Sequence, residues 1–263
     1  MIYNTINKVN TNYKNITLFW ACMNGFEKVA LDLIPKISNE TINQIDNNNN
    51  TALILACENG LKNVTLELID RMSNESISQV NNNNNNALIV ACFNGLDKVA
   101  LKLINRMSNE SINKINNNKN NALILACYKG LNKVALKLIS RMSNESINQI
   151  NVFNQTALIW ACIYRLEKVA LELIDKMTNK TINQIDNHKN TALIWACENK
   201  LEDVALELID RMTNKTINQV DNDNRCAYDY AIKNKLIDVI NRLKHQNATI
   251  IYKLKWIIKC CAF

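Results

Sequence analysis

Residues 51–85 read TALILACENGLKNVTLELIDRMSNESISQVNNNNN, and this stretch decides the fold of the chain. Its dipeptide Ala-Cys recurs every 35 residues without slippage. The six copies begin at Ala21, Ala56, Ala91, Ala126, Ala161 and Ala196, and Ala231 holds the same register without the cysteine. A period of this length is typical of a solenoid, in which small supersecondary units stack on one another.

Each unit predicts a pair of helices. Thr51 is a good N-cap residue, and the apolar residues that follow it have the spacing of one helical face. We expect Gly60 to end this helix in the left-handed conformation, and all 4 glycines of the chain occupy this place in a unit. A second helix is expected over about 61–72, where apolar residues form a wide stripe at helical spacing.

The rest of the unit predicts one short helical turn and an asparagine-rich loop. Ser73 is a good cap for a single turn that would tuck Ile77 and Val80 under the stack. Runs of asparagine then close each unit, and the chain contains 47 asparagines in all. Asparagine tolerates a positive φ better than other non-glycine residues, so we interpret these runs as ordered, tight loops.

One unit is too small to fold alone, because ordering its backbone costs roughly 1–2 kcal/mol per residue and its own apolar side chains cannot offset that. Neighbouring units that cover both of its faces supply the missing burial. We therefore predict an all-α solenoid of seven 35-residue helix-turn-helix repeats over residues 16–246. A partial repeat at 1–15 and a capping tail at 247–263 are expected to flank it.

The composition narrows the class of protein further. With only 4 glycines and 1 proline, it excludes collagen-like sequence and disfavours a sandwich or barrel built on tight hairpins. The first 20 residues lack a basic start followed by an apolar run, and no stretch of 18 apolar residues occurs. These features predict an intracellular, cytoplasmic protein whose thiols are reduced.

The repeat pattern resembles the ankyrin repeat over residues 16–246. The residues of the second unit that carry the resemblance are Thr51, Leu53, Ala56, Cys57, Gly60, Val64, Leu68 and Ile69. The period is 35 rather than the family's usual 33, alanine replaces the family's proline, and isoleucine replaces its histidine. The resemblance implies a non-enzymatic scaffold that binds a partner protein on the concave face of the stack.

The abundance of asparagine and isoleucine also resembles the ankyrin arrays encoded by giant DNA viruses of amoebae. This second resemblance implies a viral protein, a host protein as its partner, and the host cytoplasm as its location.

No arrangement in the sequence indicates catalysis, a metal site, a cofactor or a small-molecule substrate. His188 and His245 have no metal-ligand or triad spacing, and every glycine is a helix terminator, which leaves none for a phosphate loop. The six periodic cysteines lie beside alanine on an apolar helical face, so we interpret them as small buried thiols. Trp20, Trp160 and Trp195 share a slot that is otherwise Leu or Val, and we interpret that slot as core.

The position after the cysteine is the most informative one in the unit. It holds Met23, Glu58, Phe93, Tyr128, Ile163 and Glu198, and Tyr164 adjoins it. A position needed for packing would be uniform, as the Ala-Cys pair is, whereas this one varies and carries large apolar groups in the middle of the array. Because the ankyrin resemblance places it on the concave face, we predict that these seven residues bind a partner protein. Drift at a tolerant surface position is the alternative.

Two other functions stay open, a weak nucleic-acid binder and a peripheral membrane tether. A basic residue recurs near the end of each second helix, at Arg71, Arg106, Arg141, Lys176 and Arg211. The helix dipole favours basic residues at this place and explains the series. A basic surface ridge that binds nucleic-acid phosphates would show the same series. The last four residues begin at Cys260 and loosely fit the C-a-a-X form, which would tether a prenylated tail to a membrane. We predict neither nucleic acid nor membrane as the main partner, because the net charge of +7 is mild and the tail is short.

Overall fold

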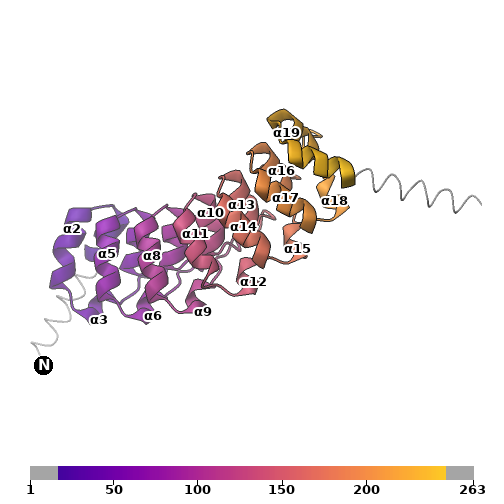
Figure 1. Ribbon diagram of the computed structural model, residues 1–263. Coiled ribbons are helices and arrows are strands. Elements are labelled where there is room, and N and C mark those ends of the chain that lie inside the picture. The colour runs from indigo at the N-terminus through magenta and orange to yellow at the C-terminus, as the bar shows by residue number, and fades with distance from the viewer. Residues whose placement is uncertain (1–16, 247–263) are drawn as a thin grey trace, which may run out of the picture. The chain divides into compact units, whose positions relative to one another are not determined.

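The computed structural model describes residues 17–246, and helices and loops make up this range apart from two isolated β-bridges. The chain forms two compact units, which we call the N-terminal unit (residues 1–149) and the C-terminal unit (residues 150–263). Both units repeat the same helix pair followed by one short helical turn (Figure 1). The described range holds seven helix pairs, four in the N-terminal unit and three in the C-terminal unit, and a short turn follows each of the first six.

The N-terminal unit contains four first helices and four second helices. Its first helices are residues 17–23, α4 (Ala52–Glu58), α7 (Ala87–Phe93) and α10 (Ala122–Tyr128). Its second helices are α2 (Glu27–Leu33, continued by the 3-10 helix η1, Ile34–Lys36), α5 (Lys62–Arg71), α8 (Asp97–Arg106) and α11 (Asn132–Ile139). The short turns are α3 (Asn39–Ile42), α6 (Asn74–Ile77), α9 (Asn109–Ile112) and α12 (Asn144–Ile147).

The C-terminal unit repeats this order. Its first helices are α13 (Ala157–Ile163), α16 (Ala192–Glu198) and α19 (Ala227–Asn234). Its second helices are α14 (Glu167–Lys176), α17 (Glu202–Arg211) and the helical residues 237–246, and its short turns are α15 (Asn179–Ile182) and α18 (Asn214–Ile217).

Within each unit the first helices form one row and the second helices another. In the N-terminal unit α4, α7 and α10 pack side by side, as do α5, α8 and α11 (Figure 1). The Ala-Cys pair lies between the rows, and the side chains of both Ala56 and Cys57 are 0% exposed. Small apolar side chains at this place let neighbouring helices approach closely, which explains why the pair repeats.

The predicted helix starts are confirmed in the second repeat. The Thr51 hydroxyl accepts a hydrogen bond from the Ile54 amide at 3.2 Å, and the Ser73 hydroxyl accepts one from the Ser76 amide at 3.2 Å. These side chains satisfy N–H groups that a helix start leaves unpaired. The short turn buries Ile77, as predicted, but Val80 is only half-buried, because it lies beyond the turn that carries Ile77 inward.

The turn that follows each first helix contains one residue in the left-handed conformation, whether or not that residue is glycine. Gly60 has φ +68°, as predicted. Arg165, Lys200 and Lys235 occupy the same place in later repeats with φ of 59°, 63° and 60°. The turn therefore depends on the packed helices on either side, and three repeats adopt it at the cost of strain that glycine avoids.

The periodic arginines bind the preceding repeat. The guanidinium of Arg106 donates to the carbonyl oxygens of Ile69 at 2.6 Å and Met72 at 3.1 Å, and to the side chain of Asn74. Arg71, Arg141 and Arg211 make the same contacts one repeat away. The cation thus caps the end of the neighbouring helix rather than its own, a contact that the helix-dipole explanation did not identify.

The asparagine-rich loops, which we call fingers, are ordered by side-chain hydrogen bonds. The fingers are residues 46–50, 81–85 and 116–120 in the N-terminal unit, and 151–155, 186–190 and 221–225 in the C-terminal unit. The Asn81 carbonyl oxygen Oδ1 accepts from the amides of Asn83 and Asn85 at 3.0 Å each. Asn84, with φ 56°, donates from Nδ2 to Asn117 of the next finger at 2.6 Å. The prediction of ordered, tight loops is therefore confirmed.

Candidate functional site

The residue after each Ala-Cys pair lies at or near the surface. It is the last residue of its first helix, and a helix advances about 100° per residue, so it turns away from the buried pair before it. Met23 is 51% exposed and Phe93 49% exposed, Glu58 is exposed, and Tyr128, Ile163 and Glu198 are half-buried. The slot that varies in sequence is therefore also the slot that reaches solvent.

In the N-terminal unit this slot brings two aromatic rings together. The rings of Phe93 and Tyr128 stack with centroids 6.4 Å apart and planes 16° apart. The Lys129 ammonium lies 5.2 Å from the Phe93 centroid and 5.1 Å from that of Tyr128. A cation at this distance from two ring faces stabilises the pair in one arrangement while leaving much of Phe93 open to solvent.

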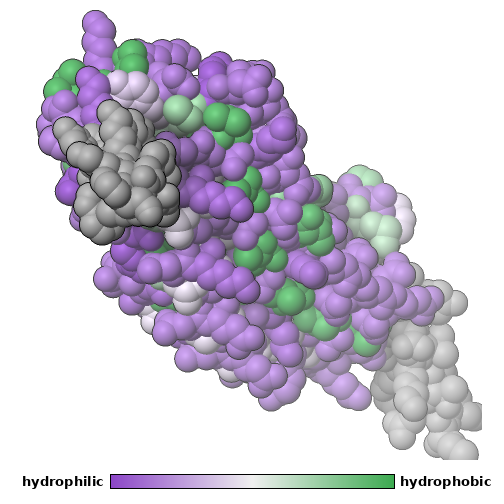
Figure 2. Space-filling model, turned by 90° about the vertical axis from the view of Figure 1, so that its right-hand side faces the viewer, coloured by the Kyte–Doolittle hydropathy of each residue, from purple (hydrophilic) through white to green (hydrophobic). Residues whose placement is uncertain are grey.

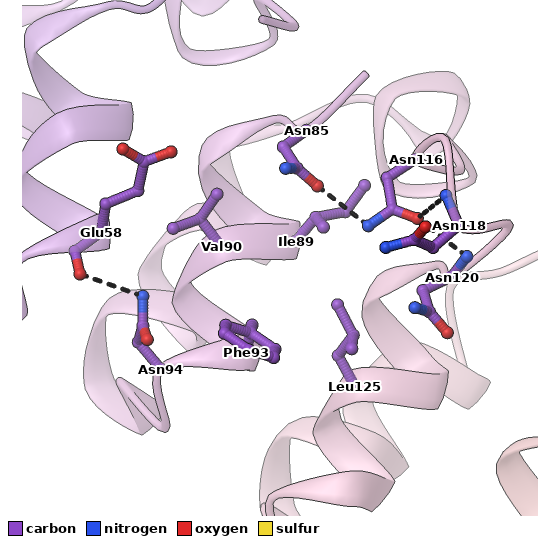
Figure 3. A pocket seen from close by; sticks show the side chains of 10 residues that line it. All are labelled: Glu58, Asn85, Ile89, Val90, Phe93, Asn94, Asn116, Asn118, Asn120 and Leu125. Carbon is purple, nitrogen blue, oxygen red and sulfur yellow. Dashed lines mark hydrogen bonds between the residues drawn. The ribbon is translucent and has the colours of Figure 1, made fainter. Parts of the chain in front are cut away.

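A cleft of about 360 Å³ opens beside Phe93, between the first helices and the fingers. Its walls combine apolar side chains, amides and one carboxylate (Figure 3). The lining residues are Glu58, Asn85, Ile89, Val90, Phe93, Asn94, Asn116, Asn118, Asn120 and Leu125. In the close-up Glu58 lies at one end, Asn116, Asn118 and Asn120 lie at the other, and Val90, Phe93 and Leu125 lie between them (Figure 3).

The finger wall of the cleft is held in place by its own hydrogen bonds. Asn116 donates from Nδ2 to Oδ1 of Asn85 at 3.0 Å. Its own Oδ1 accepts from the backbone amides of Asn118 at 3.1 Å and Asn120 at 3.0 Å. The two fingers therefore present amide groups to the cleft from fixed positions.

Glu58 is a carboxylate without a cation among the described residues. Its pKa is raised above the ordinary range, first by partial burial and then by the nearby carboxylate of Asp46. None of the ion pairs between residues 17 and 246 includes Glu58. A cation brought to this end of the cleft would lower the cost of holding the charge.

In the C-terminal unit, Tyr164 is 45% exposed and its ring lies 6.0 Å from that of Trp160. Ile163 and Glu198 end α13 and α16 and are half-buried. Phe93 and Tyr128 belong to the N-terminal unit, so the expectation that the residues of both units form one patch stays a prediction.

The expectation that the tryptophan slot is core is wrong for Trp20 and holds only in part for the other two. Trp20 is 54% exposed, and its ring lies 5.0 Å from that of Phe26. Trp160 and Trp195 are half-buried, whereas Leu55, in the same slot, is 4% exposed. The slot is deep enough for leucine or valine, and the larger indole extends out of it toward the surface.

The six periodic thiols are buried, as predicted. Burial raises the pKa of Cys22 and of Cys197 to about 12, and it also raises the pKa of Cys57, Cys92 and Cys162. A thiol of this kind stays protonated and apolar at neutral pH, which suits a packing role.

Two apolar residues in a finger of the C-terminal unit are exposed although the repeat pattern did not predict it. Val152 is 45% exposed and Phe153 is 53% exposed. Cys260 lies outside the described residues.

No helix between residues 17 and 246 is both long and apolar enough to cross a membrane. Within the same range, no group of three or more His, Cys, Asp or Glu side chains is arranged to hold a metal ion.

Helix pairs that stack in register around small buried side chains define the class of all-α repeat solenoids. The family model described as "Ankyrin repeats (3 copies)" matches residues 18–116, 100–186 and 123–219. The chain therefore belongs to the ankyrin-repeat family, and the predicted all-α, ankyrin-type fold is confirmed.

Solved structures agree with this assignment. The crystal structure of the human ASB11 ankyrin repeat domain has 18% sequence identity and a TM-score of 0.54, and the match covers 81% of this chain and 90% of that one. A second match is a chain from the complex of the predatory endopeptidase Bd0816 from Bdellovibrio bacteriovorus with the immunity protein Bd3460. It has 22% identity and a TM-score of 0.53, and it covers 74% of this chain and 97% of that one. No curated protein matches in sequence. These likenesses show the fold, and ankyrin repeats are in general non-enzymatic domains for protein interaction.

Proposed function

We propose that this chain is a non-enzymatic scaffold that binds a partner protein through the concave face of its ankyrin repeats. The proposed contact residues are Met23, Glu58, Phe93, Tyr128, Ile163, Tyr164 and Glu198. They come from one slot of the seven-repeat array over residues 16–246 or adjoin it, the first four in the N-terminal unit and the last three in the C-terminal unit.

The observation that carries this proposal is the contrast between two adjacent positions. Ala91 and Cys92 are 0% exposed and are repeated almost without change, whereas Phe93, the next residue, is 49% exposed and differs from repeat to repeat. A stacked pair of aromatic rings beside an open cleft is the kind of surface that protein interfaces use, with aromatic anchors at the centre and charged groups at the rim.

The proposed partner and location rest on the resemblance to the ankyrin arrays encoded by giant DNA viruses of amoebae. The asparagine-rich and isoleucine-rich sequence supports a viral origin, a host protein as the partner, and action in the host cytoplasm. One of the similar chains comes from a complex of two proteins, which is consistent with a role in protein binding.

The proposal is tested by changing Phe93, Tyr128 and Ile163 together to Ser. We expect this triple variant to lose capture of partner proteins in affinity purification from host cells, because it removes the apolar surface that binding would bury. Its melting temperature should stay close to that of the unmodified chain, since none of the three side chains is fully buried.

A triple variant on the short turns, Glu75, Glu110 and Glu145 changed to Gln, is the matched control, because all three side chains are exposed and lie outside the proposed surface. It should capture the same proteins as the unmodified chain. Unchanged capture by the Ser variant, or a large drop in its melting temperature, would refute the assignment of the surface.

A further inference from the structure

The two ends and the middle of the cleft beside Phe93 carry different chemical groups, and their order indicates what binds there. The inference rests on the proposed function, because it names the kind of partner segment that the same surface would accept. The cleft lies wholly within the N-terminal unit, between α4, α7 and α10 and the fingers 81–85 and 116–120.

One end of the cleft is anionic. Glu58 lies there, and Asp46 is close enough to raise its pKa further above the value that burial alone would give. None of the ion pairs of the described residues includes Glu58, and the Lys129 ammonium lies over the rings of Phe93 and Tyr128. A basic side chain from a partner would therefore be attracted to the Glu58 end and repelled from the ring end.

The middle of the cleft is apolar. Val90, Leu125 and the half-exposed ring of Phe93 line it (Figure 3), and Val90 and Leu125 are 5% and 6% exposed. A volume of about 360 Å³ is near the lower limit for ligand pockets, so it suits one or two side chains of an extended segment rather than a folded domain.

The far end offers hydrogen bonds suited to a peptide backbone. The side-chain amide of Asn118 has no partner among the described residues, and that of Asn85 uses only Oδ1, which leaves its Nδ2 group open. An asparagine side chain carries both a donor and an acceptor, which matches the N–H and C=O of an extended peptide.

Hydrophobic side chains remain visible among the mainly hydrophilic residues of the molecular surface (Figure 2). Phe93 is one of the residues that stay exposed in this way, and it is the one that borders the cleft. The combination of an exposed ring, an unpaired carboxylate and unpaired amides around one cavity sets this place apart from the other exposed apolar residues of the described chain.

We propose that the cleft binds an extended peptide segment of the partner, with a lysine or arginine side chain at Glu58 and a neighbouring apolar side chain between Val90, Phe93 and Leu125. The backbone of that segment lies along the amides of Asn85 and Asn118.

The test selects ligands from a library of random dodecapeptides displayed on phage, with the full chain as the immobilised target. We expect enriched peptides to share a basic residue next to or near an apolar one. The affinity of one enriched peptide, labelled with fluorescein, is then measured by anisotropy. Glu58→Gln should weaken its binding about tenfold or more, because the variant removes the charge that pairs with the basic side chain and keeps the shape.

Two further variants sharpen the result. Glu58→Lys should bind a version of the peptide in which the basic residue is changed to Glu better than it binds the original peptide. Glu145→Gln is the control, since Glu145 is exposed on α12 and away from the cleft, and it should leave the affinity unchanged. Circular dichroism of each variant confirms that it is folded.

Several outcomes would overturn the proposal. They are the absence of any enriched peptide, enrichment of acidic peptides or of peptides without a basic residue, and equal affinity of the unmodified and Glu58→Gln chains. Any of these would leave the proposed function standing if the triple Ser variant still loses partner capture, because that experiment uses whole proteins and does not depend on Glu58.

Discussion

At the scale of the residue, the repeat separates positions that build the stack from positions that are free to vary. Each Ala-Cys pair is 0% exposed, and the thiol is surrounded closely enough for burial to raise the pKa of most of these cysteines. The next residue along the helix reaches solvent and differs between repeats. Sequence periodicity predicted this division, because a buried slot with the same neighbours in every repeat accepts few side chains.

The buried cysteines give a prediction about reactivity. We expect Cys22, Cys57, Cys92, Cys127, Cys162 and Cys197 to resist Ellman's reagent at about pH 8 in the folded protein, because all six sulfur atoms are buried and the reagent cannot reach them. All should react once guanidinium unfolds the chain, and Cys226, which is half-buried, should react earlier. Rapid reaction of the six thiols before unfolding would contradict their burial.

The buried thiols of Cys22, Cys57, Cys92, Cys162 and Cys197 make stability depend on alkaline pH. Their folded pKa lies above the unfolded value of about 9, so only the unfolded chain ionises as the pH rises from about 9 toward 12. The free energy of unfolding should therefore fall as the pH rises over this range. At lower pH the thiols are protonated in both states, so they should not make the free energy of unfolding depend on pH.

The turn after the first helix gives a second prediction at this scale. Gly60→Ala should lower the free energy of unfolding by about 1 kcal/mol, because φ is +68° there and an added Cβ would meet no atom within 4 Å, so that backbone strain alone acts. Lys200→Gly, at the same place in the sixth repeat, should raise it by about 0.5–1 kcal/mol. Chemical denaturation measures both, and effects of the same sign would contradict this explanation.

At the scale of the element, an arginine joins four of the second-helix segments to the repeat before, through Arg71, Arg106, Arg141 and Arg211. The period predicted that a basic residue ends each second helix, but it could not identify the acceptor, because the spacing along the chain does not tell whether a long side chain folds back on its own helix or reaches the next. The carbonyl oxygens of Ile69 and Met72, one repeat earlier, are the acceptors for Arg106.

Replacing this arginine tests its energetic role. Arg106→Ala should lower the free energy of unfolding by about 1.5–3 kcal/mol, because it leaves helix-terminal carbonyls of α5 without a charged donor. Lys176 is the matched control. It holds the same place in the fifth repeat but pairs with Glu172 of its own helix at 3.6 Å, partly exposed, so Lys176→Ala should cost less than about 0.5 kcal/mol. Equal losses in urea titrations would show that the inter-repeat bonds contribute little.

At the scale of the whole molecule, the sequence was sufficient for the class of fold and insufficient for several details of the surface. The unbroken period predicted the stacked helix pairs, and capping residues such as Thr51 predicted where they begin. The period continues through residue 149, so it does not indicate that the chain forms two compact units. The period also predicted that Trp20 is buried, whereas its side chain is 54% exposed. The prediction was wrong because a repeated apolar position does not reveal how large a side chain the site can bury.

The candidate site shows the same limit. The variable slot predicted that Phe93 and Glu58 bind a partner. The asparagines of the fingers, which complete the cleft, were predicted only to form loops, because spacing along the sequence does not show which loop faces which helix. The cleft joins residues 58 and 85 of one repeat, 93 and 118 of the next, and Leu125 of the one after that.

The most direct test of the central claim, that partners bind at the exposed slot beside the buried Ala-Cys pair, is site-specific photo-crosslinking in host cells. Benzoylphenylalanine replaces Phe93 in one version of the chain and Glu145, on the exposed turn α12, in another. Ultraviolet light should join a partner protein covalently to the chain labelled at position 93 and not to the chain labelled at position 145. Adducts of equal yield from both positions, or none from position 93, would contradict the claim.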